Sequence, residues 1–201
     1  MSKQYIKSAK AVQKESIVKP DLIIFDFDGC IANSDDFIVT NKEAYKLDKL
    51  IHKMPKERDN DICLEYLQKH NLDIEPYEGI FKLFVKLCLS SNIALVTSRF
   101  DYFQKDTFNW LKIKTIEHFN ESIWRQMRFN AYFNVEQRKS LEFKRDTMKA
   151  LSQKYNIVLL IDDHPEVVNW AEGQGITVLT PSTGYKNLNS KDLMETNKCT
   201  K

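Results

Sequence analysis

The chain has 201 residues, which is enough for one main domain with a substantial core. Lysine and arginine number 30 against 28 aspartates and glutamates, so the net charge of +2 gives no global argument for a nucleic-acid, membrane or acidic partner. The four cysteines show neither close pairs nor CxxC spacing, and we expect no disulfide partner and no zinc site. No apolar run approaches the roughly 20 residues of a membrane span, so we expect a cytoplasmic protein with no membrane partner.

The first 20 residues are basic. Lys3, Lys7, Lys10 and Lys14 recur at helical spacing before Pro20 ends the segment. Two interpretations stay open: a basic N-terminal arm that contacts a partner, or a solvated terminus that frays because it lacks an apolar face. The main domain is expected over residues 21–181, and the polar residues 182–201 are expected to form a loosely ordered tail.

The domain opens with DLIIFDFDGC, residues 21–30. The apolar run predicts a buried strand, and an unpaired charge at its end would cost on the order of several kcal/mol. Because side chains alternate along an extended segment, Asp26 and Asp28 can face one small volume. The two carboxylates therefore require a positive group close by.

Helices and strands alternate along the rest of the domain. Apolar stripes over about 34–74 predict a small helical cap, inserted before a further helix over 80–90. NIALVTSRF, residues 92–100, predicts a second buried strand, which ends in Thr97, Ser98 and Arg99. A helix follows over 103–112, a short third strand within 125–133, and a helix over 140–155 that carries Lys144.

NIVLLIDDHP, residues 156–165, repeats the pattern of the first strand, because an apolar run again ends in two acids, Asp162 and Asp163. A helix and a last strand at 176–179 follow. Such alternation predicts an α/β fold, a Rossmann-like doubly wound parallel sheet with helices on both faces. There is no internal repeat.

Ligands of such sheets bind beyond the carboxyl ends of the strands, where the polar residues of this chain gather. Four carboxylates, from Asp26, Asp28, Asp162 and Asp163, would repel one another unless a cation joined them. Hard oxygen ligands favour Mg²⁺, which often takes phosphate as a further ligand. Lys144 can supply a second positive group, although its basic neighbours on the predicted helix equally fit a solvated helix face.

These motifs, in this order, resemble the haloacid dehalogenase superfamily over most of the chain. DFDG resembles its first motif, Thr97 in LVTSR its second, Lys144 its third and IDD its fourth. The resemblance implies that Asp26 is the nucleophile and Asp28 the general acid and base. It further implies that Mg²⁺ binds Asp26, the Asp28 backbone carbonyl and the fourth-motif acids, with Asp162 the direct ligand and Asp163 beside it.

Asp28 bears on the reaction type. Relatives that cleave carbon–halogen bonds resemble this motif without the second aspartate, because a halide leaves without a proton. The oxygen that leaves from a phosphate ester, by contrast, needs a proton. The resemblance therefore favours phosphomonoester hydrolysis, with Thr97 and Lys144 holding the phosphoryl oxygens.

Within the superfamily, LVTSRFDYFQKDTFNWLK and LLIDDHPEVVNWAEGQGITVL look most like the 3′-phosphatase domain of phage-type polynucleotide kinase. This resemblance implies that Arg99, beside Ser98, grips the substrate phosphate of a nucleic-acid 3′ end. Ser98 replaces the usual glycine, and no GxxxxGK[ST] loop is present, so no kinase half is expected. Two alternatives stay open: a small-molecule nucleotidase, and a non-catalytic binding module that retains the metal site.

Overall fold

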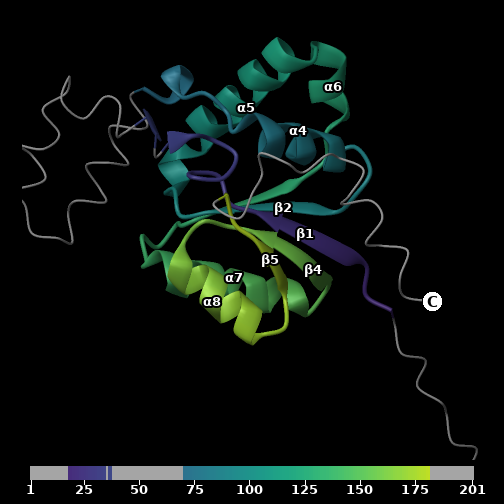
Figure 1. Cartoon of the computed structure of the whole chain (residues 1–201), viewed down its shortest axis with the longest axis vertical. Helices are drawn as coiled ribbons and strands as arrows, with labels where there is room; N and C mark the ends of the chain where they lie inside the picture. Colours follow the sequence, from purple (N-terminus) through teal and green to yellow (C-terminus); the bar gives the residue numbers. More distant parts are fainter. Residues whose placement is uncertain (1–17, 35, 38–69, 182–201) are drawn as a thin grey trace, which may run out of the picture.

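The structure, a computed structural model, describes residues 18–34, 36–37 and 70–181. The predicted arm and tail, and the predicted cap apart from its two ends, therefore lie outside the described residues. In the described part, five strands form one parallel sheet, with helices on both of its faces (Figure 1). The predicted α/β doubly wound architecture is thereby confirmed.

The sheet has the order β3-β2-β1-β4-β5. Its strands are β1 Asp21–Phe25, β2 Ile93–Thr97, β3 Asn130–Phe133, β4 Asn156–Ile161 and β5 Thr177–Leu179. The chain builds outward from β1 to β3 on one side, and then crosses back to place β4 on the other side. This reversal between β1 and β4 is the topological switch point at which sheets of this class bind ligands.

Helices cover the two faces as separate layers (Figure 1). One layer contains α4 Glu78–Leu87, α5 Gln104–His118 and α6 Glu121–Gln126, and the other contains α7 Ser140–Ser152 and α8 Pro165–Gly173. Two short 3₁₀ helices, η1 Asn71–Asp73 and η2 Asp101–Phe103, precede α4 and α5. Pro165 begins α8 because its missing N–H would have no helical partner there.

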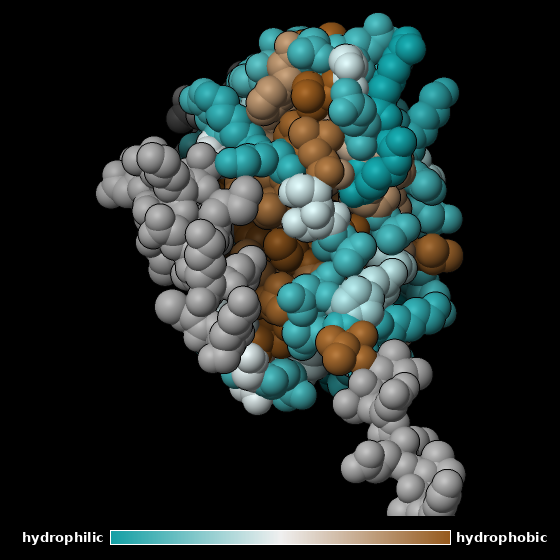
Figure 2. All heavy atoms as spheres, turned by 90° about the vertical axis from the view of Figure 1, so that its right-hand side faces the viewer, coloured by the Kyte–Doolittle hydropathy of each residue, from teal (hydrophilic) through white to brown (hydrophobic). Residues whose placement is uncertain are grey.

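Alternation along β1 divides the core between the two layers. Phe25 packs with Phe84 and Trp110 on the α4–α5 side, whereas Leu22 and Ile24 pack against α7 and α8. Figure 2 shows apolar residues gathered in the middle of one face of the molecule, with hydrophilic residues to their right. Among the described residues, none of the helices combines the length and apolarity needed to cross a bilayer.

Candidate active site

The two acid-ended strands place Asp26 and Asp162 side by side at the switch point. Phe25, the last residue of β1, pairs in register with Ile161, the last residue of β4. The backbone N–H of Asp26 continues the ladder by donating to the Ile161 carbonyl at 2.8 Å. Both carboxylates are buried, with Asp162 fully inaccessible.

Lys144 lies between these two acids. Its Nζ is 2.8 Å from Asp26 Oδ2 and 2.7 Å from Asp162 Oδ2. The lysine is 2% exposed, although it belongs to a helix rich in exposed charges. The structure therefore excludes the solvated-face interpretation for this residue and supplies the positive group that the buried carboxylates require.

Charge in this cluster is unevenly balanced. Burial raises the pKa of Asp26 well above its usual value, and the charges of Asp162 and Asp163 raise it further, while Lys144 opposes them. Burial alone would lower the pKa of Lys144, but Asp26 and Asp162 outweigh it and the net pKa is raised. Three carboxylates beside one lysine leave an excess of negative charge that suits a divalent cation.

The cluster also offers a suitable donor set for such a cation. One ligand atom from each of Asp26, Cys30 and Asp163 lies within 4.8 Å of the others. Gly29 has φ +71°, and a Cβ built on it would lie 2.3 Å from Asp163 Oδ2, so only glycine lets the loop approach Asp163 this closely. Two carboxylates around a small space fit Mg²⁺, whose preferred ligands are oxygens.

The structure separates the roles that the sequence assigned to the fourth-motif acids. Asp162 Oδ2 accepts from Lys144, and its Oδ1 accepts from the backbone N–H of His164 at 2.9 Å. Asp163, by contrast, faces Asp26 across the candidate metal space, with the Cys30 thiol 3.7 Å from its Oδ1. The geometry therefore favours Asp163, rather than Asp162, as the direct ligand.

Asp28 points to a different partner. Its two carboxylate oxygens accept from Arg99 Nε at 2.7 Å and Nη2 at 2.8 Å, a bidentate pair. The side chain of Arg99 is 3% exposed, whereas that of Asp28 is 24% exposed. The predicted grip of Arg99 on a substrate phosphate stays a prediction.

The remaining predicted residues line the end of β2. Thr97 is buried, and its Oγ1 accepts from the Arg99 backbone N–H at 3.2 Å. The Ser98 hydroxyl lies 2.5 Å from the Ser140 hydroxyl at the start of α7. Ser98 is thereby tied to the helix that carries Lys144.

The sequence did not indicate a role for two buried polar residues near this site. Asn71, in η1, and Thr107, in α5, both accept hydrogen bonds from Arg99. They lie 28 and 8 residues from Arg99 in the sequence, and neither spacing belongs to a motif that would mark them as its partners. Only their burial as polar groups marks them.

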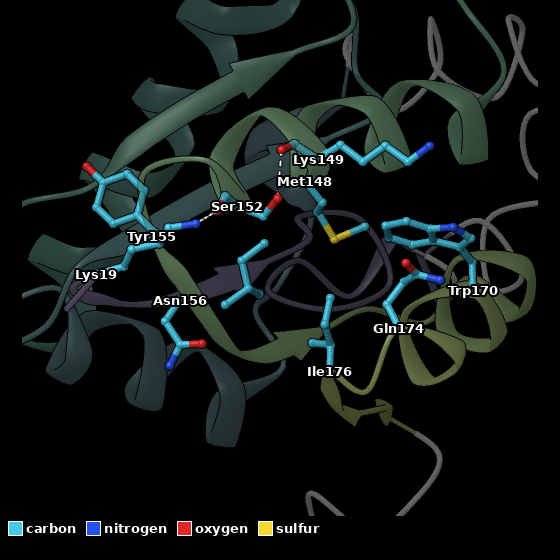
Figure 3. A pocket seen from close by; sticks show the side chains of 10 residues that line it. Lys19, Met148, Lys149, Ser152, Tyr155, Asn156, Trp170, Gln174 and Ile176 are labelled. Carbon is cyan, nitrogen blue, oxygen red and sulfur yellow. Dashed lines mark hydrogen bonds between the residues drawn. The ribbon is translucent and has the colours of Figure 1, made fainter. Parts of the chain in front are cut away.

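A pocket of about 330 Å³ lies apart from this cluster, beside the first residues of β4 (Figure 3). Figure 3 shows Trp170 and Met148 at one end and Lys19 and Tyr155 at the other. Lys19 Nζ donates to the Ser152 carbonyl there at 2.7 Å. The carboxylate cluster, at the carboxyl ends of β1 and β4, does not line this pocket.

No family model and no curated protein matches the chain. Solved structures do match. A chain of the Pnkp1/Rnl/Hen1 complex is 12% identical with a TM-score of 0.52, and the match covers 88% of this chain but only 51% of that one. A haloacid dehalogenase-like hydrolase from Streptococcus pneumoniae is 14% identical with a TM-score of 0.53, covering 81% of this chain and 84% of that one.

A third similar structure is Protein Tyrosine Kinase A from Mycobacterium tuberculosis, at 16% identity and a TM-score of 0.50, covering 81% of this chain and 83% of that one. This chain spans about half the length of the matched chain in the Pnkp1/Rnl/Hen1 complex. At these identities the likeness shows the fold alone, which is haloacid dehalogenase-like. Function has to be argued from the site.

The imbalance of charge at Asp26 leads to a prediction about stability. Because the pKa of Asp26 is higher in the fold than in the unfolded chain, the protonated carboxyl stabilises the fold. This contribution is complete below the unfolded pKa of about 4, and it is lost as the pH rises through the folded pKa. In metal-free buffer at pH 7.5, about 3.5 units above that unfolded pKa, Asp26→Asn should therefore raise Tm. A gain of about 1 kcal/mol corresponds to roughly 3 °C for a domain of this size.

Thermal unfolding in chelator, followed by circular dichroism at several pH values, measures this effect. The difference in Tm should shrink as the pH falls toward 4. Asp21→Asn serves as the control, because it makes the same change on the exposed end of the same strand. A variant less stable than the wild type at pH 7.5 would contradict the electrostatic account.

Proposed function

We propose that this protein is a Mg²⁺-dependent phosphomonoester hydrolase that acts through a phosphoaspartate on Asp26, on nucleic-acid 3′ ends or nucleotides. One observation carries the proposal. Asp26, a buried carboxylate at the switch point, lies beside the buried Lys144. Two residues further along the chain, Asp28 forms an ion pair with Arg99. A purely structural cluster would not need the second acid.

In the first half of the proposed reaction, an Asp26 oxygen attacks phosphorus and the bond from phosphorus to the ester oxygen breaks. For this step Asp28 must first have taken up a proton from solvent on one carboxylate oxygen, and it gives that proton to the departing oxygen, which leaves as an alcohol. In the second half, water attacks the phosphoaspartate and gives a proton to Asp28. The bond between Asp26 and phosphorus then breaks, releasing phosphate and restoring both acids.

The surrounding residues stabilise charge. Asp26, Asp163 and the backbone carbonyl of Asp28 would hold Mg²⁺, which when bound neutralises negative charge on the phosphoryl oxygens and the carboxylates. Lys144 and Thr97 are the groups proposed to hold phosphoryl oxygens. Such positioning and neutralisation suit the loose transition state of phosphoryl transfer.

The choice of nucleic-acid ends or nucleotides rests on the motif resemblance around Thr97 and Asp162. It is supported by the shared fold with a chain of the Pnkp1/Rnl/Hen1 RNA repair complex, at a TM-score of 0.51. A small-molecule nucleotidase would use the same chemistry, whereas a binding module would retain the metal site without turnover. These three possibilities give different results in two successive assays.

Phosphate release from p-nitrophenyl phosphate, with Mg²⁺ and with chelator, separates an enzyme from a binding module. A 3′-phosphorylated oligonucleotide is then compared with a 3′-mononucleotide by catalytic efficiency. Preference for the oligonucleotide, weakening steeply with salt, supports nucleic-acid ends, because each phosphate contact releases counterions. Equal efficiency on both substrates favours the nucleotidase, and no release from any ester refutes the proposal.

The metal assignment gives a separate prediction. Asp163→Asn should raise the Mg²⁺ concentration needed for half-maximal activity, by roughly tenfold or more, because a neutral amide replaces a carboxylate ligand. Magnesium titrations of activity and of Tm measure the shift. Asp21→Asn should leave both titrations unchanged, and an unshifted titration for Asp163→Asn would show that this residue is not a ligand.

A further inference from the structure

Each of the three nitrogens of the Arg99 guanidinium donates to a side chain. Nε and Nη2 donate to the two oxygens of Asp28, while Nη1 donates to Asn71 Oδ1 at 2.8 Å and to Thr107 Oγ1 at 3.1 Å. The guanidinium also lies over the Phe27 ring, 4.3 Å from its centroid. Turning this buried group would leave donors unpaired, so the contacts select one orientation.

Asn71 and Thr107 reach Arg99 from two different elements. Asn71 belongs to η1, and its Nδ2 donates to the Asp106 backbone carbonyl at 2.8 Å, which ties η1 to α5. Thr107 lies on α5 itself, fully buried, and Asn71 is 4% exposed. The pair thus forms a buried wall behind the guanidinium, on the side away from Asp28.

We propose that Asn71 and Thr107 are positioning residues that hold Arg99 on Asp28 and so fix the acid that serves the leaving group. This inference rests on the proposed function. It also gives Arg99 a role different from gripping substrate phosphate. A guanidinium that moved to a phosphate would have to abandon Asp28 and leave that carboxylate without its bidentate partner. Arg99 therefore acts through Asp28.

The basicity of the leaving oxygen provides the test. A general acid accelerates the cleavage of an ester more when the departing oxygen is more basic. Phenyl phosphate and p-nitrophenyl phosphate are close in shape, but phenolate is the stronger base and depends more on the acid. A variant that misplaces Asp28 should therefore lose more activity on phenyl phosphate, whereas a variant that is merely less stable loses equally on both esters.

The matched variants are Thr107→Val and Thr115→Val. Both make the same change at buried positions of α5, but the Thr115 hydroxyl contacts Met127 Sδ at 3.8 Å rather than Arg99. For Thr107→Val and for Asn71→Ala, kcat/KM on phenyl phosphate should fall roughly fivefold to tenfold further than kcat/KM on p-nitrophenyl phosphate, because kcat/KM reports the steps up to loss of the leaving group and not the shared hydrolysis of the phosphoaspartate. Thr107→Ser, which restores a hydroxyl, should restore the wild-type ratio, and Thr115→Val should keep it.

A second readout does not depend on turnover. The Arg99 Nε–H should exchange slowly with solvent in the wild type, as seen by ¹⁵N-resolved NMR, and faster in Thr107→Val and Asn71→Ala but not in Thr115→Val. If the wild type hydrolyses neither ester, the proposed function fails, while the exchange rates still test the network. Equal losses on both esters, or unchanged exchange in Thr107→Val and Asn71→Ala, would overturn the positioning role.

Discussion

Asp26→Asn should abolish turnover of phosphomonoesters, with kcat reduced by roughly four orders of magnitude or more, while the protein remains folded. An amide fills nearly the same space as the carboxylate, but it is too weak a nucleophile to form the covalent intermediate. Lys144 keeps Asp162 as a partner in the variant, so the cluster does not lose its buried cation. Phosphate release under saturating Mg²⁺ measures the loss.

Two comparisons make this result specific. Asp21→Asn, on the same strand, should retain wild-type kcat, because its exposed side chain lies at the opposite end of β1. Trapping with acid after a brief incubation with ³²P-labelled substrate should label the wild type and leave Asp26→Asn unlabelled. Near-normal turnover by pure Asp26→Asn would exclude the phosphoaspartate mechanism.

The strands were predictable because their signals are local. Apolar runs bounded by acids or hydroxyl residues mark β1, β2 and β4, and register then brings Asp26 beside Asp162. Lys144 was ambiguous because charged residues surround it in the sequence, although its spacing from Met148 and Leu151 places it on the apolar stripe of its helix. The three-dimensional packing of α7 on β4 was needed to decide.

Arg99 shows where reasoning from residue types reaches its limit. The planar fork of a guanidinium suits phosphate and carboxylate oxygens equally well, so the sequence could not choose between the substrate and Asp28. That choice depends on Asn71 and Thr107, which reach Arg99 only after η1 and α5 have packed together. In the same way, the choice between Asp162 and Asp163 as metal ligand depends on which carboxylate already serves Lys144.

Lys144→Met should destabilise the protein by about 3–5 kcal/mol, because removing one partner of a buried ion pair leaves the other charges uncompensated. Asp26 and Asp162 would then face each other without the cation that now lies between them at 2.8 and 2.7 Å. Methionine retains much of the length of the lysine side chain, so the loss reports charge rather than a cavity. Urea unfolding in metal-free buffer measures it, and turnover should be lost as well.

Lys149→Met is the matched control, since Lys149 is exposed on the same helix and its replacement should change stability by less than about 0.5 kcal/mol. The double variant Lys144→Met with Asp26→Asn should recover more stability than Asp26→Asn adds to the wild type, because without the lysine the two carboxylates repel each other unopposed. Added Mg²⁺ should likewise stabilise Lys144→Met more than the double variant, which has lost a proposed ligand. If the two substitutions were instead additive, the buried lysine would be acting on the fold through its packing and not through the charge of Asp26.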